Sequence, residues 1–176
     1  KLVANKLGIK LYDKDFITKV AEETGLSEEF IENNEQKRNN LAGLNNGYYM
    51  GLNNSDELFL EEAETIKKLA NEESCVIVGR CADFILKDRK DVIKVFIYSD
   101  MENKIKRAIE IYGIKKNKAE KEIKRINKLR ANHYKYYTEQ DWKNHSNYDL
   151  SINSDSIGIE KTADLVCELA YEKIKV

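Results

Sequence analysis

Apolar and polar positions follow one another along this chain in blocks that predict short strands between longer helices. The strand-like blocks are short apolar runs, and we predict strands at 9–12, 75–78, 92–98 and 148–152. The two middle runs have the pattern of strands that are buried on both faces of a sheet. Apolar residues spaced by three or four positions predict helices at 15–24, 28–33, 55–71, 101–112, 116–137 and 159–174.

Strands that alternate with helices of this length indicate crossover connections, and therefore a parallel sheet in a single α/β domain over residues 1–176. In open parallel sheets, ligands bind beyond the carboxyl ends of the strands. That rule selects four segments, each of which carries at least one charged residue: 12–14, 79–83, 99–100 and 153–155. We expect the functional site at this edge.

Two segments of the chain depart from the regular alternation. Residues 37–54 are rich in Asn and Gly, which predicts a mobile loop. The sequence starts at Lys1 in what has the pattern of the second half of an amphipathic helix, which Gly8 ends. We therefore expect that a further segment belongs upstream of Lys1.

The composition narrows the class of protein. The chain has 176 residues, is 41% hydrophobic and carries a formal charge of −1, which excludes wholesale disorder. Its apolar runs are far shorter than the roughly 20 residues of a membrane span, and no signal peptide opens it. Three cysteines without metal-ligand spacing argue against a disulfide scaffold or zinc site, so we expect a reducing cytosol.

Positive charge is concentrated in one predicted helical stretch. Residues 104–137 hold 12 Lys and Arg against 3 Asp and Glu. This stretch is either a solvated helix face or an electrostatic clamp for an anion. Aromatic residues follow Arg130, so binding of single-stranded nucleic acid is a further possibility. The acidic remainder of the chain and the pI near 6.3 make nucleic acid the weaker alternative.

Arg80 is the first candidate for a chemical role. It follows Gly79 at the end of a predicted strand, where its planar guanidinium suits a phosphate or a carboxylate. The alternative is an ion pair with Asp83 or Asp100 that only ties the turn.

Asp13 and Lys14 follow the first predicted strand in the same way. Asp13 could orient a hydroxyl or amine of a substrate, and Lys14 could contact a phosphate. The alternative for Asp13 is that it caps the helix predicted at 15–24.

Five segments together resemble the cytidylate kinase-like family, a bacterial branch of the P-loop nucleoside monophosphate kinases. The resemblance extends over nearly the whole chain. The segments are KLGIKLYDKDFI (Lys6–Ile17), CVIVGRCADFIL (Cys75–Leu86), KVFIYSD (Lys94–Asp100), RANHYKYYT with the following W (Arg130–Thr138, Trp142) and NYDLSINS (Asn147–Ser154).

The resemblance implies a three-layer α/β/α fold of the P-loop NTPase type, with a parallel sheet and a helical lid at about 115–145. It implies ATP-dependent phosphorylation of a nucleoside monophosphate, CMP- or dCMP-like, or of a similar small acceptor, with Mg²⁺. The partners are then small nucleotides, and neither a membrane nor a nucleic acid is expected. The loop at 37–54 would lie on the acceptor side.

The resemblance also implies roles for single residues. The acceptor nucleotide would be bound by residues at two strand ends and on the helix after the first strand: Asp13, Lys14, Lys19, Arg80 and Asp83. The lid would supply Arg130, with Lys128 and Arg125 as further cations. The adenine of ATP would lie near the segment from Ser154 to Ile157.

The sequence departs from the family pattern at three places. Cys81 stands where cytidylate kinases carry an acidic residue, and Asn127 stands where the lid acid is expected. The glycine-rich phosphate loop and its strand are not in the sequence, and we expect them just before Lys1. Two functions are therefore open: an active kinase, or an inactive nucleotide-binding or regulatory protein on the same fold.

Overall fold

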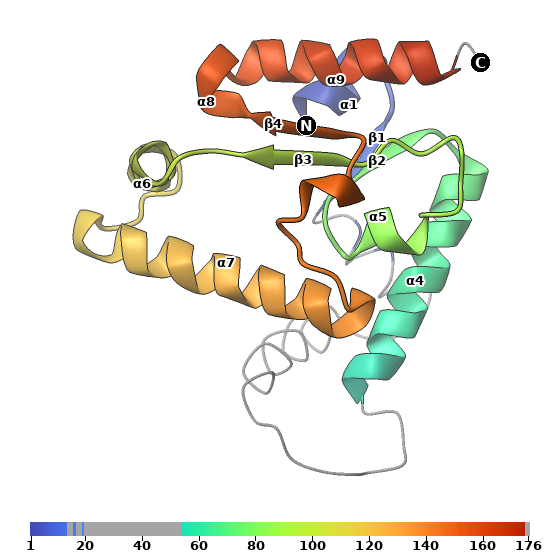
Figure 1. The fold of residues 1–176 in the computed structure, drawn as a ribbon, viewed down its shortest axis with the longest axis horizontal. Coiled ribbons are helices and arrows are strands. Elements are labelled where there is room, and N and C mark those ends of the chain that lie inside the picture. The colour runs from blue at the N-terminus through green and yellow to red at the C-terminus, as the bar shows by residue number, and fades with distance from the viewer. Residues whose placement is uncertain (14–15, 17–18, 20–53, 175–176) are drawn as a thin grey trace.

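The computed structural model describes residues 1–13, 16, 19 and 54–174. The elements in chain order are α1 (Leu2–Leu7), β1 (Lys10–Tyr12), α4 (Asn54–Glu72), β2 (Cys75–Ile77), α5 (Ala82–Ile85), β3 (Val95–Tyr98), α6 (Met101–Glu110), α7 (Lys116–Thr138), η1 (His145–Asn147), β4 (Leu150–Asn153), α8 (Ser154–Ile157) and α9 (Ile159–Ile174) (Figure 1). The helix predicted at 28–33 and nearly all of the loop predicted at 37–54 lie outside the described residues.

The predicted alternation of short strands and longer helices is confirmed for the described part of the chain. The strand predicted at 92–98 begins only at Val95. Val92 belongs to the apolar run because it packs against the hydrophobic core, not because it lies in the strand. Three short elements were not predicted: α5, η1 and α8. Each has only three or four residues, too few to display a hydrophobic period.

The strands pair in parallel, as predicted, but they form two separate ladders. β1 pairs with β2, with Leu11 opposite Val76, and β3 pairs with β4, with Ile97 opposite Ile152. Among the described residues, β2 and β3 thus each have a single strand neighbour. Figure 1 shows β3 and β4 between α9 on one side and α7 on the other.

The prediction that the two middle strands are buried on both faces is wrong. All three residues of β2 are only partly buried, while Val78 and Ile97 are each 52% exposed. A strand in a two-stranded ladder has one edge without a neighbouring strand, so its side chains are less completely covered. The apolar sequence of these strands is thus typical of a sheet with more strands than the two-stranded ladders of the described residues.

The hydrophobic core lies where α4 covers the first ladder and α5. Seven buried side chains form it: Tyr12, Phe16, Leu58, Ile66, Leu69, Ala82 and Leu86. Leu58, Ile66 and Leu69 lie on one face of α4 and are at most 1% exposed. Burying each of these large side chains contributes about 1.5–3 kcal/mol. The core therefore fixes the ends of β1 and β2 relative to α5.

Aromatic contacts fix the carboxyl-terminal end of α7 to α4. The ring of Phe59 on α4 stacks on Tyr137 with centroids 3.8 Å apart, and His133 contacts Phe59 edge-on at 6.3 Å. The Tyr137 hydroxyl also donates a hydrogen bond to Asp56 at 3.4 Å. α7 also packs against α6, which lies beside its amino-terminal end in Figure 1.

A second group of rings attaches the segment after α7 to β3. Phe96 stacks on Tyr148 at 4.9 Å and meets Trp142 edge-on at 5.4 Å. His145 lies within 5.9 Å of Phe96 and 5.7 Å of Tyr98. The predicted lid is therefore anchored at its carboxyl-terminal end to α4 and β3.

Candidate active site

Arg80 emerges at the carboxyl end of β2, as predicted, on a tight left-handed turn. Gly79, Arg80 and Cys81 have φ angles of 82°, 59° and 55°. A left-handed conformation costs a residue other than glycine roughly 1–2 kcal/mol. The turn is held by amide hydrogen bonds, from Ala82 to the Gly79 carbonyl and from Ile85 to the Cys81 carbonyl. Such strain, kept in place by its surroundings, is typical of functional sites.

The surroundings of Arg80 are acidic and largely closed to water. Its side chain is 18% exposed, and its Nη1 lies 3.6 Å from Oε1 of Glu62, a residue on α4 that is 1% exposed. Burial lowers the pKa of Arg80, and the charge of Asp13 opposes that shift. Asp13 directly follows β1, whose last residue, Tyr12, is opposite Ile77 in β2. The paired strand ends therefore bring Asp13 and Arg80 within electrostatic range of each other.

Glu62 is a site residue that the sequence reasoning missed. The sequence suggests Asp83 or Asp100 as an ion-pair partner for Arg80, whereas the structure places the Glu62 carboxylate 3.6 Å from its guanidinium. A signal was present, because Glu62 is four residues after Leu58 and four before Ile66, on the apolar face of α4. An acidic residue within an apolar stripe needs a buried partner.

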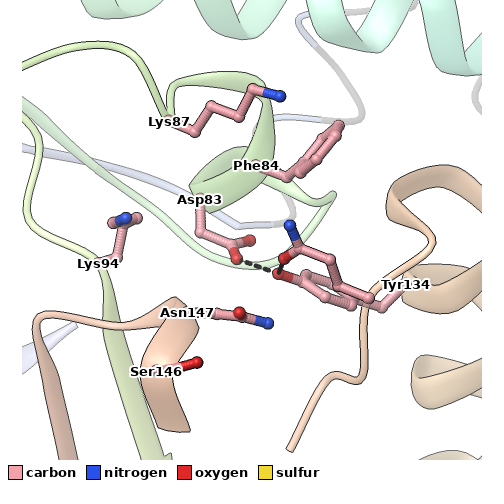
Figure 2. A pocket seen from close by; sticks show the side chains of 8 residues that line it. Asp83, Phe84, Lys87, Lys94, Tyr134, Ser146 and Asn147 are labelled. Carbon is pink, nitrogen blue, oxygen red and sulfur yellow. Dashed lines mark hydrogen bonds between the residues drawn. The ribbon is translucent and has the colours of Figure 1, made fainter. Parts of the chain in front are cut away.

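Asp83 lies in a small polar cavity beside α7. The Tyr134 hydroxyl donates a hydrogen bond of 2.7 Å to Oδ2 of Asp83, across 51 positions of sequence (Figure 2). The cavity has a volume of about 220 Å³, and its other lining residues are Phe84, Lys87, Lys94, Gln140, Ser146 and Asn147. Lys94 directly precedes β3, so the cavity lies at the amino end of that strand. Asp83 thus ties α5 to α7, and its contact with a substrate stays a prediction.

On α7, the structure separates Arg130 from the other predicted lid cations. Arg130 precedes Tyr134 by four residues and Tyr137 by seven, so it shares their helix face, which packs toward α5 and α4. Arg130 is nevertheless exposed. Arg125 and Lys128 are five and two residues away from Arg130, spacings that put them on other sides of the helix.

Arg125 and its neighbour Lys124 are paired on α7 itself. Arg125 donates two hydrogen bonds to Glu122, of 3.0 and 2.6 Å, which raise the pKa of Arg125. Lys124 pairs with Glu120 at 2.6 Å. These contacts fit the alternative that much of the basic stretch is a solvated helix face.

For the two predicted acceptor-side lysines, Lys14 and Lys19, binding of the acceptor stays a prediction. Lys14 lies outside the described residues. The charge of Lys19 adds to the effect of Tyr12 and Lys10 in lowering the pKa of Glu73.

The ends of β3 and β4 are tied together by polar contacts. Asp155 accepts hydrogen bonds from the Asp100 amide at 2.6 Å and the Ser99 hydroxyl at 2.9 Å, and these lower its pKa. The Ser154 hydroxyl donates to the Tyr98 carbonyl at 3.2 Å. Ile157 is 41% exposed and adds an apolar surface at this edge. A role for Ser154 and Ile157 in adenine binding stays a prediction.

Two buried tyrosines, Tyr12 and Tyr134, and the partly buried Tyr148 make the fold sensitive to high pH. Burial is the main cause that raises the pKa of Tyr12, Tyr134 and Tyr148 above the ordinary value, that of Tyr148 to about 12. The unfolded chain loses these protons near pH 10. We therefore expect unaltered stability below about pH 10 and a loss of stability as the pH rises toward 12.

A titration followed by tyrosinate absorbance and circular dichroism tests this expectation. Exposed tyrosines should ionise near their ordinary pKa, and a second group should ionise only as the fold is lost. If all 10 tyrosines ionise in one step with the fold intact, the described burial of these hydroxyls is contradicted.

Two features of the described residues concern metal ions and membranes. The described part of the chain has no group of three His, Cys, Asp or Glu side chains that could hold a metal ion. None of the helices within that same part has both the length and the apolar character needed to cross a bilayer.

Comparisons with known proteins indicate what this chain is similar to. A search of curated proteins found no match. A solved structure, the crystal structure of an uncharacterized protein from Eubacterium ventriosum ATCC 27560, is similar, with a TM-score of 0.72 and 26% sequence identity over 96% of this chain and 86% of that chain. The profile of the cytidylate kinase-like family matches residues 1–156. The chain, with its paired strand ends and its basic helix α7, therefore belongs to the cytidylate kinase-like family.

Proposed function

We propose that this protein transfers a phosphoryl group from ATP to a nucleoside monophosphate, CMP- or dCMP-like, or to a similar small phosphate acceptor. The observation that carries the proposal is Arg80, a largely buried guanidinium at the carboxyl end of β2 and near Asp13. A guanidinium fork can bind phosphate through two parallel hydrogen bonds. The family of the chain supports the same reaction type.

The proposed roles follow from where the side chains lie. Arg80 would bind the acceptor phosphate, and Asp13 would orient a hydroxyl or amine of the acceptor. Arg130, on the packing face of α7, would stabilise negative charge on the transferred group when the lid at about 115–145 closes. Phosphoryl transfer depends on positioning and charge stabilisation rather than on acid–base chemistry, so this set of residues suits it.

ATP would bind at the edge formed by the ends of β3 and β4. The exposed side chain of Ile157, next to Ser154, offers an apolar surface for the adenine. Mg²⁺ is usually held by one or two carboxylates together with phosphate oxygens and waters. Mg²⁺ would therefore enter together with ATP, as part of the substrate.

The two separate ladders support a further element of the proposal. β2 and β3 each have one strand neighbour among the described residues, and their apolar side chains are incompletely covered. We propose that a strand from outside the described residues joins them into the parallel sheet of one three-layer P-loop domain. A glycine-rich loop after that strand would bind the ATP phosphates.

A second function, nucleotide binding without turnover, is favoured by Cys81. This residue stands where cytidylate kinases carry an acidic residue, and here its side chain is 3% exposed and lies at the start of α5. A thiol is only a weak hydrogen-bond donor and acceptor, so it is a poor substitute for a carboxylate that binds a base.

An assay of ADP formation separates the two functions. The full-length protein is incubated with Mg²⁺, ATP and one acceptor at a time, from CMP and dCMP through the other nucleoside monophosphates. Phosphoryl transfer predicts ADP formation that requires one of these acceptors. ATP binding by calorimetry without ADP formation from any acceptor supports the second function, and absence of ATP binding contradicts both.

A further inference from the structure

The buried face of α4 contains one residue that does not suit a hydrophobic core. Glu62 is 1% exposed and lies between Leu58 and Ile66, which are 1% and 0% exposed. Removing a carboxylate from water carries a large penalty unless an opposite charge compensates it. An apolar side chain would stabilise a core position of this kind more than a carboxylate does. Packing alone therefore does not explain the presence of Glu62.

The guanidinium of Arg80 lies next to the Glu62 carboxylate and compensates its charge. Oε1 of Glu62 lies 3.6 Å from Nη1 of Arg80, and the Arg80 side chain is itself only 18% exposed. The pair joins a residue in the middle of a 19-residue helix to a residue on a strained turn. The helix is held by the core and cannot easily shift, so Glu62 provides a fixed point for a long and otherwise flexible side chain.

A second carboxylate competes for the same guanidinium. Asp13 lies near enough for its charge to act on Arg80 from the end of β1. With Glu62 in place, the guanidinium is held between charges from two elements. Loss of the Glu62 charge would shift the balance of attraction on the guanidinium toward Asp13, and the orientation of Arg80 should change with it.

We propose that Glu62 is a positioning residue that holds the Arg80 guanidinium in the orientation that binds the acceptor phosphate. This inference rests on the proposed function for its catalytic consequence. An arginine fork binds phosphate through a planar pair of N–H groups, so orientation matters as much as charge. A guanidinium held in place before the substrate arrives loses less conformational freedom on binding.

A double-mutant cycle in the full-length protein tests the kinetic consequence. The variants are Glu62→Gln, Arg80→Lys and the double variant, assayed with ATP and CMP. We expect Glu62→Gln to raise the KM for CMP roughly 10- to 100-fold, as displaced binding groups do, with little change in the KM for ATP. The double variant should be no worse than Arg80→Lys alone. Effects that multiply, or an unchanged KM for CMP, overturn the proposal.

The matched control is Glu64→Gln on the same helix. The Glu64 side chain is 75% exposed and pairs with Lys67, away from Arg80. This variant should leave both KM values unchanged. Should Glu62→Gln not fold, Glu62→Asp shortens the side chain but keeps its charge, and it should weaken CMP binding in the same direction.

A measurement without substrate separates this proposal from the proposed function. In protein labelled with ¹⁵N-arginine, the Nε–H signal of Arg80 is assigned by its loss in Arg80→Lys. We expect a distinct signal in the natural protein that shifts toward the position of exposed arginines in Glu62→Gln. An unshifted Arg80 signal overturns the positioning role. If no monophosphate supports ADP formation but the signal shifts as expected, only the proposed function fails.

Discussion

Replacing Arg80 with alanine in the full-length protein is expected to lower kcat/KM for the acceptor by roughly 100- to 1,000-fold. The variant removes the guanidinium that binds the acceptor phosphate. It also removes the positive charge 3.6 Å from the buried carboxylate of Glu62, so the free energy of unfolding should fall by about 3–5 kcal/mol. Steady-state kinetics with CMP and denaturant unfolding measure the two effects.

Two further variants separate the catalytic effect of Arg80 from its structural effect. Arg80→Lys keeps a positive charge beside Glu62 but loses the planar fork, so it should fold and still lose most of its activity. Arg107, an exposed residue on α6, is the control, and Arg107→Lys should leave the kinetics unchanged. Normal acceptor kinetics in a folded Arg80→Lys protein would contradict phosphate binding by the fork.

Replacing Arg130 with alanine is expected to lower kcat by roughly 1,000-fold, since an arginine that stabilises the transferred phosphoryl group has effects of that size. Arg130 is exposed, and no hydrogen bond to its side chain is seen in the described part of the chain. The free energy of unfolding should therefore change by no more than about 0.5 kcal/mol. Single-turnover kinetics with ATP and CMP report the effect on the chemical step.

Lys128 provides the matched control for Arg130. It is also exposed on α7, two residues earlier, but on a different side of the helix. Lys128→Ala should keep kcat within about twofold, as surface substitutions usually have small effects. Equal losses in the two variants would indicate that α7 acts through its overall charge, and unchanged turnover in Arg130→Ala would remove Arg130 from the site.

Some of the site could be predicted from sequence because local patterns determine it. Arg80 and Asp13 directly follow short apolar runs, so their position at strand ends depends on only a few residues. Once β1 and β2 pair in parallel, these two ends must meet at one edge. No long-range information was needed beyond the order of the elements.

Other parts of the site depend on contacts that local patterns do not contain. The partner of Arg80 is Glu62, 18 positions earlier on another element, and only the packing of α4 against the turn brings them together. The hydrogen bond between Asp83 and Tyr134 spans 51 positions and likewise follows from how α7 docks.

The sequence also did not show which of the cations on α7 lies on the face of the helix that packs toward the site. Sequence spacing groups Arg125, Lys128 and Arg130 on one helix, but the buried side must be known before one of them can be selected. Tyr134 and Tyr137 identify that side through their contacts with α5 and α4. The predicted burial of β2 and β3 was too high for a related reason. An apolar run indicates that a strand is covered on both faces, but it does not identify the segments that cover it.

The claim at the centre of this account is that Arg80, from the end of β2, and Arg130, from α7, act on the same phosphoryl chain. A crystal structure of the full-length protein with a bisubstrate analogue, in which CMP and adenosine are joined through phosphates, tests this most directly. We expect both guanidinium groups within hydrogen-bond distance of that chain, with Glu62 still against Arg80. An analogue bound with either guanidinium turned away from its phosphates would contradict the account.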